Sequence, residues 1–152
     1  MLTRTITAVL SISLLITLAG CGDPAVEPGQ GSALPPATTA AGVEGRTFLS
    51  TATAGFTLVE GTRVTLAFAD GQVTASAGCN IMSGNYTITD GRLVLDGLSM
   101  TEMGCDQALM DQDTTIAELI ASQPLLRLSE SGLDVAGSIT ISFLDRGQAD
   151  LD

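Results

Sequence analysis

Apolar and polar side chains alternate along most of the chain after residue 45, in short runs separated by turn-forming pairs of residues. Alternate residues of a strand point to opposite faces, so this pattern predicts strands with one buried side. Asp70-Gly71 and Asp90-Gly91 fit two-residue hairpin turns, because glycine accepts the positive φ that such turns need, and a third hairpin is expected around Ser131-Gly132. The alternating apolar residues are Val64, Leu66, Phe68, Tyr86, Ile88, Leu93, Leu95, Ile139, Ile141 and Phe143. The chain is therefore expected to form an antiparallel sheet built from hairpins, with one or two further short strands in 45–51 and 55–61.

One segment, residues 106–124, has helical periodicity instead. Leu109, Ile116 and Ile120 fall near one face of a helix, Asp106 can serve as its N-cap, and Pro124 ends the run. Strands, then one helix, then more strands predict an α+β fold. We expect a curved antiparallel sheet, or part-barrel, with one helix packed across it.

The first 21 residues, MLTRTITAVLSISLLITLAGC, carry the pattern of an export signal. Arg4 lies in a short polar start, and the apolar run from Ala8 to Leu18 has the length of a signal-peptide core and is too short to span a bilayer comfortably. The ending LAGC resembles the bacterial lipobox, which is cleaved before a cysteine that receives a diacylglyceryl group. Residues 1–20 are therefore predicted to be a lipoprotein signal peptide and Cys21 the lipidated residue, held by two or three acyl chains in the cell membrane.

The remaining chain divides into three parts by composition. Residues 21–44 are rich in Gly, Pro, Ala and Thr without apolar periodicity, and they are expected to form a disordered linker between the anchor and the domain. Residues 45–147 are expected to form the folded domain, and 148–152 a C-terminal tail. The protein is accordingly expected on the extracytoplasmic face of the membrane, or in the outer membrane of a cell with two membranes.

The charged residues exclude several classes of function. There are 17 Asp and Glu against six Arg, no Lys and no His, and the formal charge is −11. Nucleic-acid binding requires a basic face, so it is not expected. The absence of histidine excludes Ser-His-Asp and Cys-His catalysis and imidazole metal sites. No cofactor, metal or catalytic residue is predicted.

Two cysteines lie in the domain, Cys79 and Cys105. An even number of cysteines in an exported domain favours a disulfide, which would close the segment between them and stabilise a small fold. A zinc site would need carboxylates to complete it, and a reactive thiol would need a neighbouring base that Asn80 cannot supply. A redox-active pair remains an alternative to a structural bond.

The stretch AGCNIMSGNY followed by LSMTEMGC resembles the signature of the META domain, the HslJ-like family of bacterial envelope proteins. The matching residues are Gly78, Cys79, Asn80, Gly84, Tyr86, Thr101, Met103 and Cys105. The likeness extends over about 45–146, with Phe48 where many members have Trp and Asp113 where Glu is usual. It implies an α+β domain in exported or lipid-anchored proteins, linked to heat shock, motility and virulence, with no agreed catalytic activity.

Several other residues have side chains that could carry chemistry. Asp111 and Asp113 invite a calcium site, but the spacing of an EF-hand loop fails, so a solvated acidic helix face is expected. Glu102 and Asp106 could form a carboxylate pair of the kind used in glycoside hydrolysis, although a surface loop fits better. Asn80 and Thr101 are expected to hydrogen-bond turn backbone, with Gly78 and Gly84 letting the backbone turn. Three methionines, Met82, Met100 and Met103, are expected to fill the core, with a metal-binding or peptide-binding patch as the alternative.

The function expected from these features is a non-enzymatic binding or envelope-stabilising module, linked to stress and anchored at Cys21. Its partner would be another envelope protein or a cell-wall component, bound at an exposed sheet edge or an apolar concave face. The alternatives are a small carboxylate-dependent hydrolase and a thiol/disulfide redox protein.

Overall fold

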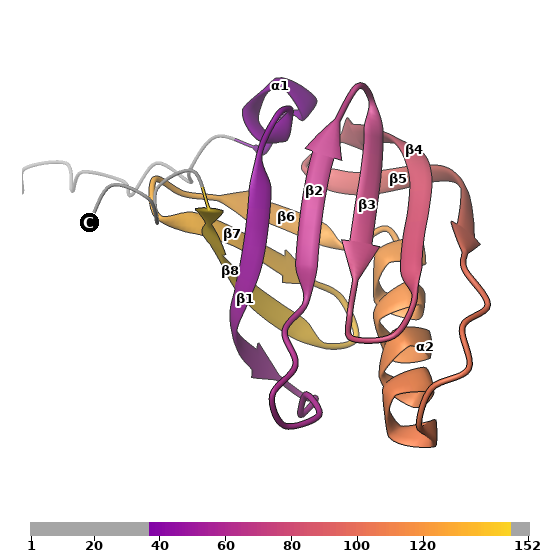
Figure 1. Cartoon of the computed structure of the whole chain (residues 1–152). Coiled ribbons are helices and arrows are strands. Elements are labelled where there is room, and N and C mark those ends of the chain that lie inside the picture. Colours follow the sequence, from indigo (N-terminus) through magenta and orange to yellow (C-terminus); the bar gives the residue numbers. More distant parts are fainter. Residues whose placement is uncertain (1–36, 147–152) are drawn as a thin grey trace, which may run out of the picture. The chain divides into compact units, whose positions relative to one another are not determined.

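The computed structural model describes residues 37–146. Its elements run in the order α1 (Ala40–Val43), β1 (Thr47–Ala54), β2 (Thr65–Ala69), β3 (Gln72–Ser76), β4 (Ile81–Thr89), β5 (Arg92–Met100), α2 (Gln107–Ala121), β6 (Leu125–Leu128), β7 (Gly132–Ala136) and β8 (Thr140–Asp145). Neighbouring strands pair antiparallel in sequence order, and β8 pairs with β1, which closes the sheet into a barrel (Figure 1). The α+β prediction of a curved antiparallel sheet with one helix across it is confirmed.

The two Asp-Gly turns form as predicted. Asp70 and Gly71 have φ of 54° and 73°, and Asp90 and Gly91 have φ of 51° and 74°. Positive φ at both central residues is the requirement of the tight hairpin turn whose twist matches the flanking strands. These turns fix the registers of β2 on β3 and of β4 on β5, so that Phe68 faces Val73 and Ile88 faces Leu93.

Strand pairing in the barrel is least extensive at two places. β5 and β6 share a single register pair, Arg92 with Leu125, and α2 is the connection between them. β1 pairs with β2 only from Thr47 to Leu49, because residues 55–61, expected as a second short strand, form a loop instead. The helix and this loop therefore close the parts of the barrel that strand pairing leaves open.

The core fills the barrel and the space under α2. Phe68 lies edge-on between Phe48 and Tyr86, with ring centroids 6.0 Å and 5.0 Å away, an arrangement that favours aromatic pairs. The helix contributes Ile116, Leu119 and Ile120, each 2% exposed or less. Asp106 occupies the N-cap position of α2 as predicted, but its side chain makes no capping hydrogen bond.

The folded structure begins earlier than the predicted boundary at residue 45. The Thr38 hydroxyl donates to the carbonyl of Leu126 and accepts from the N–H of Leu128, both at 2.9 Å, and Val43 is completely buried. Residues 37–44, expected as the end of the disordered linker, are thus packed on β6 and on the turn between β2 and β3. The predicted signal peptide, Cys21, the first part of the linker and the tail at 148–152 lie outside the described residues.

An ion pair joins the residue that precedes β1 to the last residue of β8. The Arg46 guanidinium lies 2.5 Å from a carboxylate oxygen of Asp145, and Arg46 also donates to the carbonyl of Gly42 at 2.9 Å. Asp145 is 5% exposed, so the pair closes the barrel where the chain enters β1 and leaves β8. Among residues 37–146, no helix combines the length and the hydrophobicity needed to cross a bilayer.

Candidate functional site

A disulfide joins Cys79 to Cys105, the pairing that the cysteine count predicts. The two Cα atoms are 6.2 Å apart, and the bond ties the β3–β4 loop to the loop that leads into α2. Gly78, directly before Cys79, has φ of +126°, which other residues rarely adopt, so it makes the turn as predicted. The crosslink therefore fixes two loops at one end of the barrel.

The buried Asn80 side chain lies at the centre of a hydrogen-bond network beside this disulfide. Its carbonyl oxygen accepts from the backbone N–H of Met103 at 2.8 Å and from the Thr101 hydroxyl at 2.9 Å. The Thr101 hydroxyl in turn accepts from the N–H of Ile81 at 3.1 Å. Asn80 and Thr101 thus hold loop backbone, as the sequence predicted.

Asp113 of α2 is the third member of the network, and its position differs from the prediction. It was expected on a solvated helix face with Asp111, yet Asp113 is 1% exposed while Asp111 is exposed. Its Oδ2 accepts from the backbone N–H of Asn80 at 2.6 Å and from the side-chain amide of Asn80 at 3.0 Å. Its Oδ1 is buried with no hydrogen-bond partner among the described residues. Such a carboxylate is costly to bury, so it depends on Asn80.

Gln112, the residue before Asp113, is also buried, and sequence reasoning missed it. Its side-chain carbonyl accepts from the N–H of Val59 at 2.6 Å, and its amide donates to the Thr62 hydroxyl and the carbonyl of Ala77. The available signal was positional. Gln112 and Asp113 follow Leu109 by three and four residues and precede Ile116 by four and three, which places both polar side chains on the buried face.

Gly84 and Tyr86, both in β4, have structural roles. Gly84 was expected to turn the backbone, but it lies inside the strand, where a Cβ would collide with the backbone carbonyl of Gly97. The Tyr86 hydroxyl donates to a carboxylate oxygen of Glu44 at 2.6 Å. Burial, with the neighbouring Glu44 carboxylate, raises the pKa of Tyr86 above its usual range, and the bond from Tyr86 lowers the pKa of Glu44.

The predicted carboxylate pair and the three methionines have different outcomes in the structure. Glu102 and Asp106 are both exposed, which fits the surface-loop interpretation better than an enclosed carboxylate pair. Met82 is completely buried and fills the core as expected, but Met100 and Met103 are 44% and 57% exposed, so for these two the core prediction is wrong. No group of three or more carboxylate or cysteine side chains in residues 37–146 is placed to hold a metal ion.

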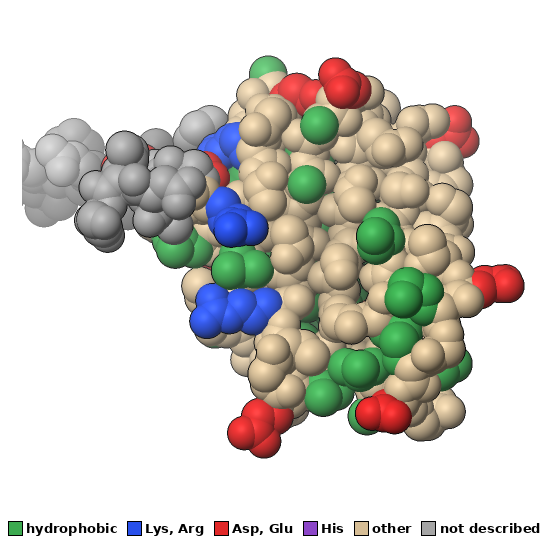
Figure 2. Space-filling view, viewed as in Figure 1, with side chains coloured by type: hydrophobic (Ala, Val, Ile, Leu, Met, Phe, Trp, Pro, Cys, Tyr) green, Lys and Arg blue, Asp and Glu red, His purple; other side chains and the backbone are tan. Residues whose placement is uncertain are grey.

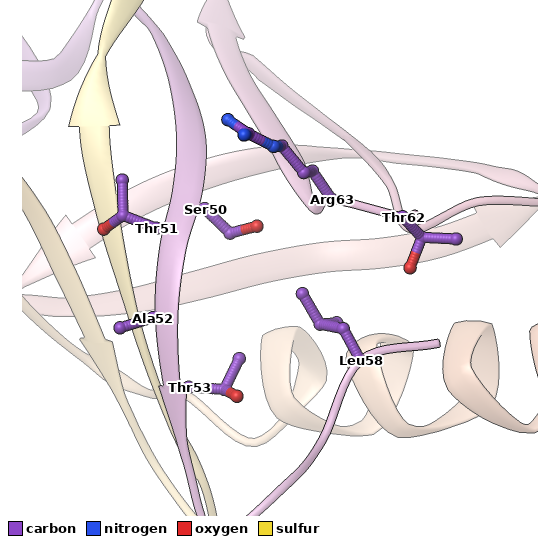
Figure 3. A pocket seen from close by; sticks show the side chains of 7 residues that line it. All are labelled: Ser50, Thr51, Ala52, Thr53, Leu58, Thr62 and Arg63. Carbon is purple, nitrogen blue, oxygen red and sulfur yellow. The ribbon is translucent and has the colours of Figure 1, made fainter. Parts of the chain in front are cut away.

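A pocket of about 320 Å³ lies beside the part of β1 that has no partner in β2 (Figure 3). Its lining contains no carboxylate and consists of Ser50, Thr51, Ala52, Thr53, Leu58, Thr62 and Arg63. The hydroxyls of Thr51, Thr53 and Thr62 already donate to backbone carbonyls, and that of Ser50 accepts from the N–H of Val64. Arg63 is the one charged residue in this lining, so the pocket offers no acid/base pair.

A family model for the META domain matches residues 37–147. The chain belongs to the META domain family. The match starts at residue 37, where the described structure also starts, so the META domain of this chain includes the segment that packs on β6. No curated protein matches the chain.

Two solved structures share the META fold of this chain. One is an NMR structure with 24% sequence identity, a TM-score of 0.61, and coverage of 75% of this chain and 97% of the other. The second is an NMR structure of a protein from Burkholderia xenovorans, with 15% identity, a TM-score of 0.59, and coverage of 78% and 96%. At these identities the likeness establishes the fold alone.

Proposed function

We propose that this META-domain protein is lipid-anchored at Cys21 on the extracytoplasmic face of the cell membrane. The LAGC sequence at residues 18–21 supports lipidation. The disulfide between Cys79 and Cys105 supports export, because such bonds persist in oxidising compartments. Residues 22–36 then connect the anchored cysteine to the packed segment that begins the domain.

The domain acts as a non-enzymatic binding or envelope-stabilising module. The observation that carries this proposal is that the signature residues bond to one another and to the backbone of the domain. Asn80 and Thr101 hydrogen-bond to loop backbone, and Cys79 and Cys105 are joined to each other. Polar groups that satisfy one another in this way fix a structure and leave little to bind or activate a substrate.

The anchor is tested by Cys21→Ala in the producing bacterium. Loss of the lipid should release the protein from the membrane fraction and abolish incorporation of labelled palmitate, while Cys79→Ser, which keeps Cys21, should still be labelled. A Cys21→Ala protein that stays with the membrane would overturn the anchor.

The binding role is tested by crosslinking in intact cells followed by mass spectrometry of the captured proteins. A specific envelope partner should be recovered with the wild-type chain, at a site on the domain surface. Recovery of abundant bystanders alone would overturn the binding role.

A further inference from the structure

Four large apolar side chains are exposed on three segments that hydrogen-bond to one another beside the disulfide, and we name the place where these segments meet the methionine corner: Ile81 at the start of β4, Met100 and Met103 at the end of β5 and in the loop after it, and Met110 in the first turn of α2. Their exposed fractions are 50%, 44%, 57% and 39%. In residues 37–146, only one other large apolar side chain is classed as exposed, Leu144 on β8 at 40%. Figure 2 shows hydrophobic side chains gathered on the part of the visible face where Figure 1 places α2 and the loop before it.

The segments that carry the methionine corner are held together by the signature network. Ile81 and Thr101 are joined by two hydrogen bonds, and Met103 is bonded through its N–H to Asn80. The helix that carries Met110 is tied to the same place through Asp113. The network therefore presents these four side chains on a fixed backbone.

Methionine suits this position if the surface binds a partner. Its unbranched thioether side chain adapts to irregular apolar shapes, and methionine is frequent on protein surfaces that bind peptides. Clustered exposed apolar residues on a small domain mark interaction sites more often than isolated ones do. The fixed backbone limits the entropy that is lost when such a surface is covered.

The charges around the methionine corner select the partner. Glu102, Asp106 and Asp111 are exposed in the loop and the first turns of α2. The segments 77–82 and 99–121 contain no Arg or Lys, and the blue side chains in Figure 2 lie on the opposite side of that view. A partner with apolar and basic side chains is favoured, because its cations would approach these carboxylates without meeting a like charge.

The corner also lies far from the place where the chain enters the domain. The entering segment contacts β6 and the turn that precedes β3, through Thr38 and Glu44. The loop that follows β3 carries Cys79, at the opposite end of that strand (Figure 1). The methionine corner therefore lies at the end of the barrel opposite to the segment, residues 37–44, through which the chain enters the domain.

We propose that the methionine corner docks an amphipathic basic segment of another envelope protein. This inference rests on the proposed binding function and adds the surface and the chemistry of the partner. The apolar face of the segment covers the methionines, and its Lys or Arg side chains pair with the surrounding carboxylates, the division of contacts by which amphipathic helices are recognised.

The test uses the chain from residue 21 with Cys21→Ser, with the disulfide oxidised and the methionine methyl groups labelled with ¹³C for NMR. The probe is a synthetic amphipathic helix of Leu and Lys, compared with the same helix carrying Glu for Lys. The basic helix should shift the methyl signals of Met100, Met103 and Met110 and saturate. The signal of Met82, which is completely buried, is the internal control.

Matched variants locate the site. Met100→Gln with Met103→Gln should weaken binding of the basic helix by about tenfold, since each loses apolar area from the contact, whereas Leu144→Gln should leave it unchanged. Glu102→Gln should weaken binding by about two- to threefold at low salt, and the exposed Glu130→Gln should not. Thermal unfolding of each variant checks that the fold is retained.

Other occupants give distinguishable results. Equal binding of the acidic helix, or no loss in the double methionine variant, overturns the proposal. Methyl shifts that grow with the concentration of the protein alone indicate a second copy, and shifts caused by phosphatidylcholine vesicles indicate a lipid surface; either result also overturns it. Because the Cys21→Ser chain is used, the outcome is independent of whether Cys21 is lipidated in the cell.

Discussion

Asn80 donates two hydrogen bonds to the same carboxylate oxygen of Asp113, from its backbone N–H at 2.6 Å and from its side-chain amide at 3.0 Å. The two residues are 33 positions apart in the sequence. The same Asn80 side chain accepts from Thr101 and Met103, so one residue links the start of β4, the loop after β5 and the helix α2. The network stabilises the contact between the sheet and α2. This helix connects β5 to β6, two strands that share a single register pair.

The first prediction concerns the stability that Asn80 provides. Asn80→Ala should lower the free energy of unfolding by about 3 kcal/mol, because it removes bonds to a loop N–H and leaves the buried Asp113 carboxylate with one donor. The measurement is urea unfolding of the Cys21→Ser chain. Asn85→Ala, at an exposed position of β4, is the control and should change stability by less than about 0.5 kcal/mol. Equal effects at the two positions would contradict the role given to the network.

The second prediction concerns the disulfide. Cys79 and Cys105 are separated by 26 residues, and the chain-entropy relation gives about 3.5 kcal/mol for closing such a loop. The double variant Cys79→Ser, Cys105→Ser should be less stable by about this amount. Reductant should destabilise the wild-type domain similarly and leave the double variant unchanged. Insensitivity of the wild type to reductant would show that the bond is absent or does not stabilise the domain.

The third prediction uses the single tyrosine of the chain, which has no tryptophan, so that phenol ionisation can be followed by absorbance. Burial and the Glu44 carboxylate hold the pKa of Tyr86 above its ordinary value. The folded protein should therefore ionise at higher pH than the urea-unfolded chain, which should titrate near about 10. Stability from this raised pKa is complete below the unfolded value and is lost as pH rises towards the folded one.

Glu44→Gln separates the two causes in that titration. It should lower the pKa of Tyr86 only in part, because burial is the larger cause and remains. Glu44 itself has a lowered pKa, mainly through the bond from Tyr86, so its contribution to stability is present above its unfolded pKa and is lost as pH falls through the folded value. A Tyr86 titration that matches the unfolded chain in the wild type would contradict the buried hydroxyl–carboxylate pair.

The features that could be predicted from the sequence are those set by residues close together in the chain. Asp70-Gly71 and Asp90-Gly91 specify their turns through their own backbone preferences, and the alternation around Leu66 and Phe68 specifies the buried face. These features gave the antiparallel α+β fold.

The features that sequence reasoning missed depend on distant partners. Thr38 is ordered by bonds to β6, about 90 residues away, in a segment without periodicity. An aspartate in a helix is usually exposed. Burial of Asp113 is possible because Asn80, which is distant in the sequence, donates hydrogen bonds to its carboxylate. The exposure of Met100 and Met103 likewise depends on where the β5–α2 loop lies on the finished domain.

The last prediction concerns Gly84, whose backbone approaches that of Gly97 across the β4–β5 pair. The register of these strands shifts between Ser83 and Asn85, which marks a bulge at Gly84, and a Cβ there would collide with the Gly97 carbonyl. Gly84→Ala should lower the free energy of unfolding by about 2–3 kcal/mol, because backbone on both strands must move. Gly104→Ala is the matched control: a Cβ at Gly104 meets nothing within 4 Å, so its stability should change little. Urea unfolding of the two variants decides the question, since equal stability would mean that β4 does not need glycine at this crossing. A large loss at Gly84 alone would assign this signature glycine to the close contact of two strands rather than to a turn.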